Sequence, residues 1–163
     1  MINNIIFAES GHEDILTELF TTSGMDLAGV VEDHILLQEE AELMAAAFVE
    51  EIEENLFHLA VFAVNPERRN QKIGSYLLQE ILKNPRQYCR NQGGAKSTSF
   101  QLTTVAKGNA VEFYKKHGFT IGEFSQLQYP YNVQCEKCLD KEACAPVPLV
   151  FTKTAYLPQK WLS

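Results

Sequence analysis

The strongest constraint on the fold of this chain is a strand, a loop and a helix that follow one another without a break. Residues 56–64, LFHLAVFAV, are apolar except for His58, which is typical of a strand buried on both faces. Residues 68–75, RRNQKIGS, are polar and basic. Apolar residues at helical spacing follow at once and predict a helix over 73–82. The pattern therefore predicts a buried strand that enters a helix through a short basic loop.

A loop of this kind suits an anion. The first amides of a helix lack partners within the helix, and together with the helix dipole they attract a phosphate. Arg69 and Lys72 add positive charge, and Ser75 adds a hydroxyl group. The glycines of a Walker A loop and of a dinucleotide fingerprint are missing, so ATP and NAD are not favoured. On this segment alone, a solvated loop that only caps the helix is the other interpretation.

The rest of the sequence predicts a mixed α/β domain. Besides residues 53–64, we expect strands over 4–10, 34–38, 42–52, 98–105, 119–124 and 148–156, and helices over 11–24, 73–82 and 107–119. A short helix is expected to start at Asn84–Pro85, and residues 25–33 are ambiguous. Residues 42–52 are rich in alanine, but turns frame them and we expect a strand. The chain contains neither repeats nor linkers, so one domain is expected over 1–163, with a cysteine-containing insertion at about 125–147.

Composition excludes several classes of partner. The formal net charge is −7 and the pI is near 5.1, which argues against nucleic-acid binding and favours a cationic partner such as an amine. Apolar runs are too short to span a membrane, and the N-terminus does not have the pattern of a signal peptide. We therefore expect a cytoplasmic protein with neither nucleic acid nor membrane as a partner, and with its four cysteines mostly reduced.

Two motifs resemble those of the GNAT superfamily of acyl-CoA N-acyltransferases. Residues 69–74 resemble its pyrophosphate-binding motif, [QR]-x-x-G-x-[GA], with Arg69 at the first position and Gly74 at the last. The flanking segments AVNPE and SYLLQEIL also look like that family. About forty residues further on, GNAVEFYKKHGF resembles its second motif, N-x-x-x-x-[FY]-Y-x-x-x-G-F, with Asn109 one residue nearer to Phe113 than in the motif. The sequence departs from the family at Lys72, which replaces the inner glycine of the loop.

The resemblance implies a fold and an activity. The fold is α/β (α+β): a mixed, mostly antiparallel central sheet of about six to seven strands, flanked by helices, with splayed central strands. The activity is transfer of an acetyl group from acetyl-CoA to a primary amine by direct attack in a ternary complex. The acceptor is a small molecule or a peptide, and a homodimer is a further expectation. By the same resemblance, the residues expected to bind the cofactor are Phe62, Ala63, Val64, Arg69, Asn70, Gln71, Lys72, Ile73, Gly74, Ser75, Asn109 and Tyr114.

Two residues are the candidates for proton transfer. His58 falls where relatives place a base, and an imidazole that titrates near neutrality suits this role. A core histidine that hydrogen-bonds a carbonyl group is the alternative. Tyr114 falls where the family's tyrosine protonates the leaving thiolate, and a packed core aromatic is the alternative. Asn109 resembles the asparagine that contacts the cofactor arm, and it could also cap the helix.

The cysteines suggest a rival interpretation. Residues 135–144, CEKCLDKEAC, give C-x2-C-x5-C, and the first pair has the spacing of metal ligands. A fourth cysteine or histidine is not close in sequence, so we do not assign a metal site. A thiol-based metal or redox module, and an acyl-CoA sensor without catalysis, are the two alternatives to an enzyme. The acidic run at 50–54 could steer a cationic acceptor, but a solvated hairpin is the simpler interpretation.

Overall fold

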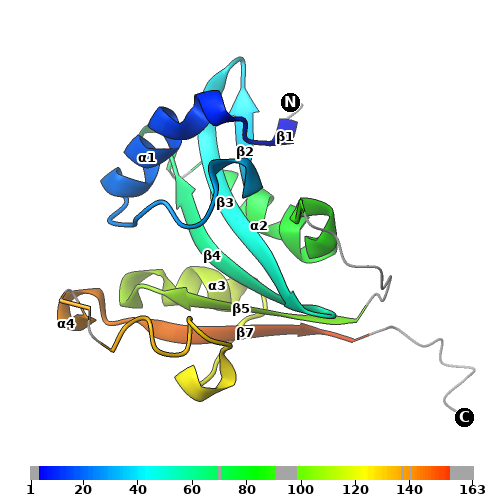
Figure 1. Cartoon of the computed structure of the whole chain (residues 1–163), viewed down its shortest axis with the longest axis vertical. Helices are drawn as coiled ribbons and strands as arrows, with labels where there is room; N and C mark the ends of the chain where they lie inside the picture. The colour runs from blue at the N-terminus through cyan, green and yellow to red at the C-terminus, as the bar shows by residue number, and fades with distance from the viewer. Residues whose placement is uncertain (1–3, 70, 91–98, 137, 140, 155–163) are drawn as a thin grey trace, which may run out of the picture. The chain divides into compact units, whose positions relative to one another are not determined.

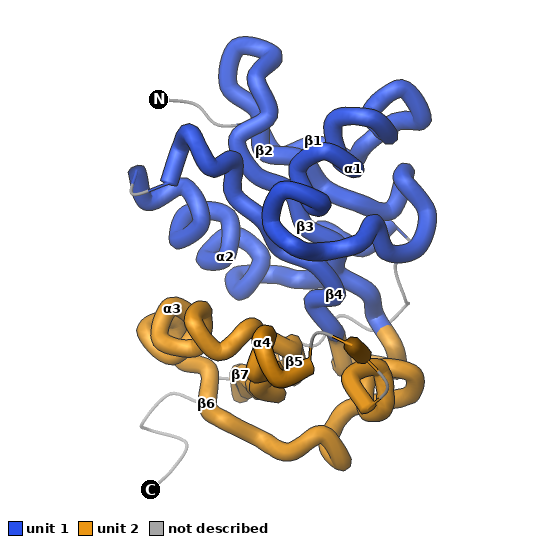
Figure 2. Tube along the Cα trace, turned by 90° about the vertical axis from the view of Figure 1, so that its left-hand side faces the viewer, with its two compact units in different colours: residues 1–51, 58–92 blue, residues 52–57, 93–163 orange. Residues whose placement is uncertain are grey.

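The structure is a computed structural model that describes residues 4–69, 71–90, 99–136, 138–139 and 141–154. The chain divides into two compact units (Figure 2). The first unit comprises Met1–Glu51 and His58–Gln92, and the second comprises Ile52–Phe57 and Gly93–Ser163. The prediction of one domain over 1–163 stays a prediction, because compact units of this kind are not by themselves separate domains.

The first unit is built on four strands and two helices (Figure 1). Its elements are β1 (Asn4–Phe7), α1 (Glu13–Thr22), β2 (His34–Glu39), β3 (Glu42–Glu53), β4 (Leu56–Val64) and α2 (Ile73–Lys83). The strands lie in the order β1-β2-β3-β4, and the pairs β1–β2 and β2–β3 are antiparallel. The β3–β4 turn lies within residues 52–57, which belong to the second unit.

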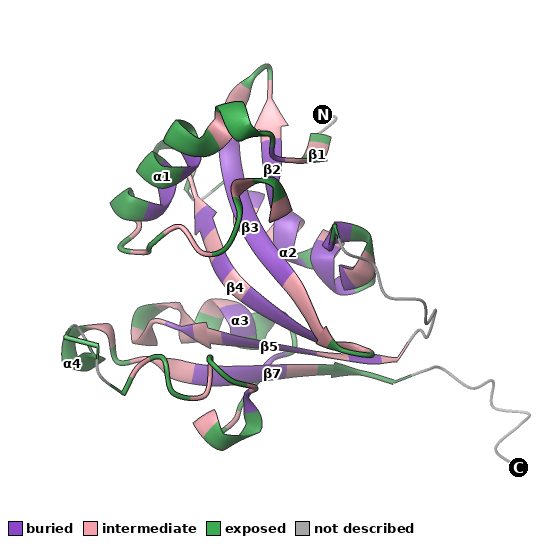
Figure 3. Cartoon of the chain, viewed as in Figure 1, coloured by how far each residue is buried: buried purple, intermediate pink, exposed green. Residues whose placement is uncertain are grey.

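The two helices of the first unit lie on either side of its strands (Figure 2). Helix α1 buries its apolar stripe of Leu16, Leu19 and Phe20 in a cluster with Leu36, Ala46, Phe48 and Val61 from the strands. Helix α2 buries a second stripe, made of Ile73, Leu77, Leu78, Ile81 and Leu82. The strands are therefore covered on both faces, as the purple segments of Figure 3 show, and this agrees with the apolar character of β4 on both faces.

Strand β3 contains the alanine-rich segment whose helical propensity made its prediction difficult. Ala45, Ala46 and Ala47 pair with Leu37, Leu36 and Ile35 of β2, and all six are buried. Small side chains allow the covering helices to approach this part of the sheet, and tertiary packing overrides the high helix propensity of alanine. The prediction of a strand is confirmed.

The second unit contains β5 (Phe100–Ala106), α3 (Val111–Lys116), β6 (Thr120–Ile121), α4 (Lys141–Cys144) and β7 (Val147–Lys153). Strand β7 pairs antiparallel with β5 on one side and with β6 on the other. The start of β4 lies beside β5, because the Gln101 amide donates to the Asn55 carbonyl oxygen at 2.9 Å. Aromatic rings fill the interior, with Phe151 at 5.9 Å from Phe100 and 5.5 Å from Phe119 between ring centroids.

The predicted fold class is confirmed. Within the described residues the sheet is mixed and mostly antiparallel, has seven strands and is flanked by helices. Short 3₁₀ helices occupy Ser10–His12, Val31–Asp33, Pro66–Arg68, Pro85–Tyr88, Gly108–Ala110 and Phe124–Gln126. The helix predicted at Asn84–Pro85 is one of these, while α4 was not predicted. The splayed central strands stay a prediction.

A membrane-spanning helix is not found. Within the described part of the chain, all helices are too short or too polar to cross a bilayer.

Candidate active site

Strand β4 carries four of the predicted site residues. Ala63 is buried, and Phe62 and Val64 are half-buried. His58 is 1% exposed, and burial lowers the pKa of its imidazole to about 3. The side chain is therefore neutral at physiological pH. Its predicted role as a base relies on a pKa near neutrality, so that role needs a direct titration and stays a prediction.

Asn65 fixes the start of the loop that follows β4. Its backbone amide donates to the Met44 carbonyl oxygen at 2.8 Å, and its side-chain Nδ2 donates to the Leu43 carbonyl oxygen at 3.0 Å. Its Oδ1 accepts from the Glu67 amide at 3.0 Å and caps the 3₁₀ helix Pro66–Arg68. The Asn65 side chain therefore connects the loop to the start of β3 and also caps the 3₁₀ helix that begins the loop.

An ion pair reinforces this attachment. The Arg68 guanidinium bonds the carboxylate of Glu42, the first residue of β3. Both side chains are more than a third exposed, so the pair contributes little stability by itself. Because Arg68 is paired with Glu42, Arg69 is the arginine of the loop that is exposed to solvent.

The loop ends at the first turn of α2. Gln71 and Lys72 are exposed, Ile73 is buried, and Gly74 and Ser75 are half-buried. Lys72 is the N-cap residue of α2, and its side chain does not make a cap hydrogen bond. The positive end of the helix dipole therefore faces a segment with exposed cationic side chains, an arrangement that attracts anions. Asn70 lies outside the described residues.

The departure from the family motif at Lys72 has a physical consequence. Its backbone has φ +61° and ψ +19°, in the left-handed region that glycine adopts without a steric cost. A residue with a Cβ pays roughly 1–2 kcal/mol there. Lys72 therefore adopts, under strain, a backbone conformation that a glycine would adopt freely.

Tyr114 is the central residue of the second motif. It lies on α3, is 6% exposed, and its ring stands edge-on to that of Phe119 with centroids 5.3 Å apart. Burial raises the pKa of its phenol, and a side-chain hydrogen bond with Thr104 of β5 opposes this shift. The phenol is protonated at neutral pH, as a proton donor must be.

The turns on either side of α3 place Tyr114. Gly118 has φ +95° and ends the helix as predicted, with its amide bonded to the Lys115 carbonyl oxygen at 3.1 Å. Asn109 is exposed within the 3₁₀ helix Gly108–Ala110. The N-cap of α3 is Ala110, so Asn109 does not cap this helix, and its predicted contact with the cofactor arm stays a prediction.

The structure groups the predicted residues in two sets. His58, Phe62–Val64 and the described loop residues belong to the first unit, and Asn109 and Tyr114 belong to the second. Sequence reasoning missed Asn65 and Thr104. The Asn65–Pro66 dipeptide is a turn signal that could have revealed the first. Thr104 is one of several small polar residues in its strand, and nothing in the pattern singles it out.

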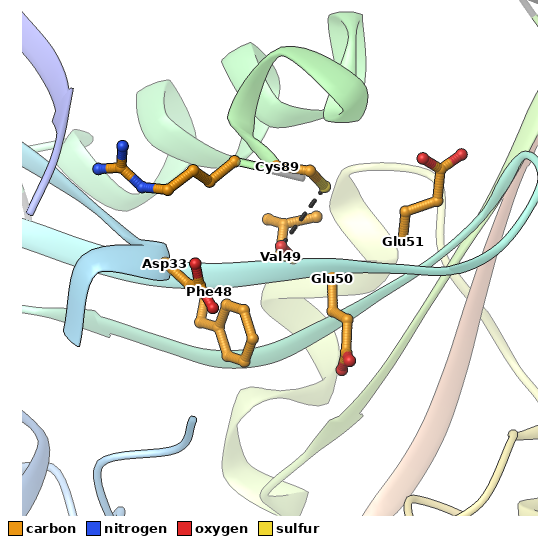
Figure 4. A pocket seen from close by; sticks show the side chains of 7 residues that line it. Asp33, Phe48, Val49, Glu50, Glu51 and Cys89 are labelled. Carbon is orange, nitrogen blue, oxygen red and sulfur yellow. Dashed lines mark hydrogen bonds between the residues drawn. The ribbon is translucent and has the colours of Figure 1, made fainter. Parts of the chain in front are cut away.

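A separate pocket of about 120 Å³ lies in the first unit (Figure 4). Its lining residues are Asp33, Phe48, Val49, Glu50, Glu51, Cys89 and Arg90. It contains none of the predicted site residues, and its volume is below that of ordinary ligand pockets.

The acidic run at 50–54 divides into two parts. Glu51 bonds Arg86 at 2.9 Å with both side chains largely buried, so this part of the run is a buried ion pair. Only the part at Glu53 and Glu54 is an exposed hairpin.

Within the described residues, groups of three or more histidine, cysteine or acidic side chains able to hold a metal ion are absent. The four cysteines are free thiols.

The chain matches one family model. A model described as an acetyltransferase (GNAT) domain matches residues 30–121, which is more than half of the chain. Among curated proteins, a sequence search found no match.

Many solved structures share the fold. N-acetylglutamate synthase from Neisseria gonorrhoeae, complexed with coenzyme A and N-acetyl-glutamate, superposes with a TM-score of 0.71 at 18% identity, over 93% of this chain and 35% of that one. Ard1 from Thermoplasma volcanium gives 0.67 at 12% identity, over 95% and 100%. The ribosomal-protein-S18-alanine N-acetyltransferase from Escherichia coli gives 0.61 at 13%, over 96% and 97%. At these identities the similarity shows the fold alone, and this chain spans about a third of the length of the Neisseria synthase.

Proposed function

Because the chain belongs to the GNAT acetyltransferase family, we propose that it is an N-acetyltransferase that moves the acetyl group of acetyl-CoA to a primary amine. The observation that carries the proposal is the loop between β4 and α2. There the N-terminus of an 11-residue helix lies beside the exposed Arg69 and Lys72, and Asn65 holds the backbone in place. This combination suits the pyrophosphate of a CoA molecule.

Binding of the cosubstrate would use both backbone and side chains. Arg69 and Lys72 would hold the phosphates together with the amides of the first turn of α2, Ile73–Ser75. The backbone of Phe62–Val64 would pair with the amides of the pantetheine arm as an added strand does. At least three of the structures with this fold are complexed with coenzyme A, which supports CoA as the ligand.

The chemistry would be a direct displacement. The neutral amine attacks the thioester carbonyl carbon, the C–S bond breaks, and the CoA thiolate leaves with one proton while the amine nitrogen loses one. Tyr114, protonated and buried, would supply the proton to the thiolate. His58, or a water molecule beside it, would take the proton from the amine. Most of the rate enhancement would come from holding the reactants in the right geometry.

The net charge of the protein is the observation that bears on the class of the acceptor. With a net charge of −7, the protein would attract a cationic small molecule or basic peptide. The named acceptors of similar structures are unlike each other, a glutamate product in one and a protein alanine in another, so they do not choose among amines. We place the reaction in the cytoplasm.

A CoA-binding sensor without turnover is the second candidate. The burial of His58 and Tyr114 favours it, because both side chains are in their neutral forms and burial makes each a weaker base or acid than usual. A sensor would bind acetyl-CoA and would not release CoA in the presence of any amine.

The first experiment is thermal melting with acetyl-CoA, CoA or ATP. A ligand at a hundredfold excess over its Kd stabilises the native state by about 2.7 kcal/mol. We expect a clear rise in Tm with both CoA species and none with ATP. Arg69→Ala should reduce the rise, whereas Lys83→Ala should not, since Lys83 lies at the opposite end of α2 and is paired with Glu80.

The second experiment measures free CoA thiol during incubation with polyamines, aminoglycosides, amino acids and basic peptides. Acetyl-CoA-dependent release with one of these classes supports the enzyme. Binding without release for any of them supports the sensor. An unchanged Tm with both CoA species contradicts both candidates.

A further inference from the structure

The cysteine segment of the second unit carries a feature that acetyl transfer does not use. The amide of Cys138 donates to the carbonyl oxygen of Cys135 at 3.3 Å. A hydrogen bond between residues three apart closes a turn, and closed turns bring the two Cα atoms within about 7 Å. Disulfides join cysteines whose Cα atoms are about 4.4–6.8 Å apart. The backbone therefore already holds these two residues at a spacing that a disulfide can bridge.

The two thiols differ in exposure in a way that suits thiol–disulfide exchange. Cys138 is exposed, and Cys135 is half-buried. Burial raises the pKa of the Cys135 thiol, and the charges of the neighbouring Cys144 and Cys138 raise it further. An exposed thiol is open to attack on a disulfide in solution, while a half-buried neighbour can resolve the mixed disulfide that results.

Cys89, the cysteine outside this segment, is an unreactive thiol in the same chain. Cys89 is buried, its Sγ donates to the Val49 carbonyl oxygen at 3.4 Å (Figure 4), and burial raises its pKa to about 12. Such a thiol is almost never a thiolate and does not react. The protein thus contains one fully buried thiol, Cys89, one exposed thiol, Cys138, and two half-buried thiols, Cys135 and Cys144.

We propose that Cys135 and Cys138 form a redox-active dithiol, and that its oxidation restricts the motion of the 3₁₀ helix Gly108–Ala110. The oxidant is a small-molecule disulfide. The thiolate of Cys138 attacks one of its sulfurs, which breaks the S–S bond and releases one thiol. The thiolate of Cys135 then attacks the Cys138 sulfur and releases the second thiol. Two protein thiols become one disulfide, and the small-molecule disulfide becomes two thiols.

Contacts within the second unit connect this pair to the turn before α3. The carbonyl oxygen of Cys138 accepts from the amide of Lys141, the first residue of α4, at 3.3 Å. The carbonyl oxygen of Lys141 accepts from the Ala145 amide at 2.8 Å. A Cβ placed on Gly108 would lie 3.1 Å from the Ala145 Cβ, so Ala145 packs directly on Gly108.

The consequence of this chain of contacts is local. A disulfide removes conformational freedom from the backbone at Cys135 and Cys138. Cys138 is hydrogen-bonded to Lys141 of α4, and Ala145 is hydrogen-bonded in turn to Lys141. Since Ala145 packs on Gly108, the first part of the rest of the unit to be affected is the 3₁₀ helix Gly108–Ala110, which holds Asn109 and leads into α3.

The test uses the full chain in glutathione buffers from fully reduced to fully oxidised. Samples are quenched in acid, denatured and alkylated, and the labels are counted by intact mass and located by peptide mapping. Reduced protein should carry a label on every cysteine, and oxidised protein should lose the two labels on Cys135 and Cys138 without gaining glutathione. Cys144→Ser, the matched control, should oxidise in the same way. Cys138→Ser should not form a disulfide.

Hydrogen exchange on the same samples tests the second half of the proposal. Oxidation should slow exchange in peptides that cover 107–110 severalfold and leave peptides of α1 unchanged. A disulfide that includes Cys144, a stable glutathione adduct on Cys138, or full labelling at every ratio of glutathione would overturn the dithiol. The expected disulfide with unchanged exchange at 107–110 would overturn the coupling. Neither readout depends on acetyl transfer, so failure here is distinguishable from failure of the proposed function.

Discussion

The two motifs of this chain use their functional side chains in opposite ways. In the first motif, residues 69–74, the cationic side chains of Arg69 and Lys72 are exposed, and a neutral residue that precedes the motif, Asn65, holds the backbone. In the second motif, residues 108–119, the central side chain is Tyr114, which is buried and hydrogen-bonded to Thr104. The charged side chains are exposed to solvent, where they can attract an anion. The side chains proposed for proton transfer are buried and neutral.

His58 gives the largest effect with which to test this contrast, since it is a titratable group buried as deeply as Tyr114. Its pKa is about 3 in the folded chain and about 6.5 when unfolded. The unfolded state therefore binds a proton first as pH falls. Stability is fully present above pH 6.5 and is lost progressively between pH 6.5 and 3, by roughly 4–5 kcal/mol in total.

The measurement is urea unfolding at a series of pH values. Between pH 6 and 5, before most carboxylates titrate, His58→Gln should reduce the slope of unfolding free energy against pH by up to about 1.4 kcal/mol per pH unit. A residual slope would report His34 and His117, whose pKa values burial also lowers. Equal slopes in the two proteins would mean that His58 is accessible to solvent, and the contrast between the motifs would then fail.

Tyr114→Phe removes only the hydroxyl group and gives the next largest effect. If the phenol protonates the leaving thiolate, kcat for acetyl transfer should fall about 100- to 1,000-fold with the Kd for CoA unchanged. Tyr88→Phe is the matched control, because Tyr88 is also a buried tyrosine whose pKa is raised by burial. A similar small loss in both variants would show that Tyr114 is a packing residue.

Asn65→Ala tests whether the first motif depends on its neutral anchor. The variant loses a cap on the 3₁₀ helix and the bond to the Leu43 carbonyl oxygen, which together should cost about 1–2 kcal/mol of stability. If the anchor positions the cationic residues, the affinity for CoA should also fall. Asn65→Asp keeps the capping oxygen but loses the donor to the Leu43 carbonyl oxygen, so it should recover only the capping part of the lost stability. Normal CoA affinity in Asn65→Ala would mean that α2 alone positions the loop.

The elements of this fold that could be predicted from the sequence are those that local periodicity determines. The apolar run of β4, the helical stripe of α2 and the turn at Gly118 each depend on neighbours in the sequence. The contacts of the site are different in kind. Asn65 meets Leu43 across 22 residues, and Tyr114 meets a threonine on another element. No spacing rule links such pairs, so neither contact could be foreseen. The burial of His58 was signalled by its apolar neighbours, but the size of the pKa shift was not.

Lys72→Gly gives the smallest effect and separates the two functions of one residue. Relief of the left-handed strain at φ +61° should raise the unfolding free energy by roughly 1 kcal/mol, which denaturant unfolding can resolve. If the Lys72 side chain also holds a phosphate, CoA affinity should fall in the same variant although the fold is more stable. Lys72→Ala, which loses the charge and keeps the strain, should weaken CoA binding without the gain in stability. A rise in CoA affinity for Lys72→Gly would instead show that the backbone alone forms the phosphate site, and that the lysine interferes with it.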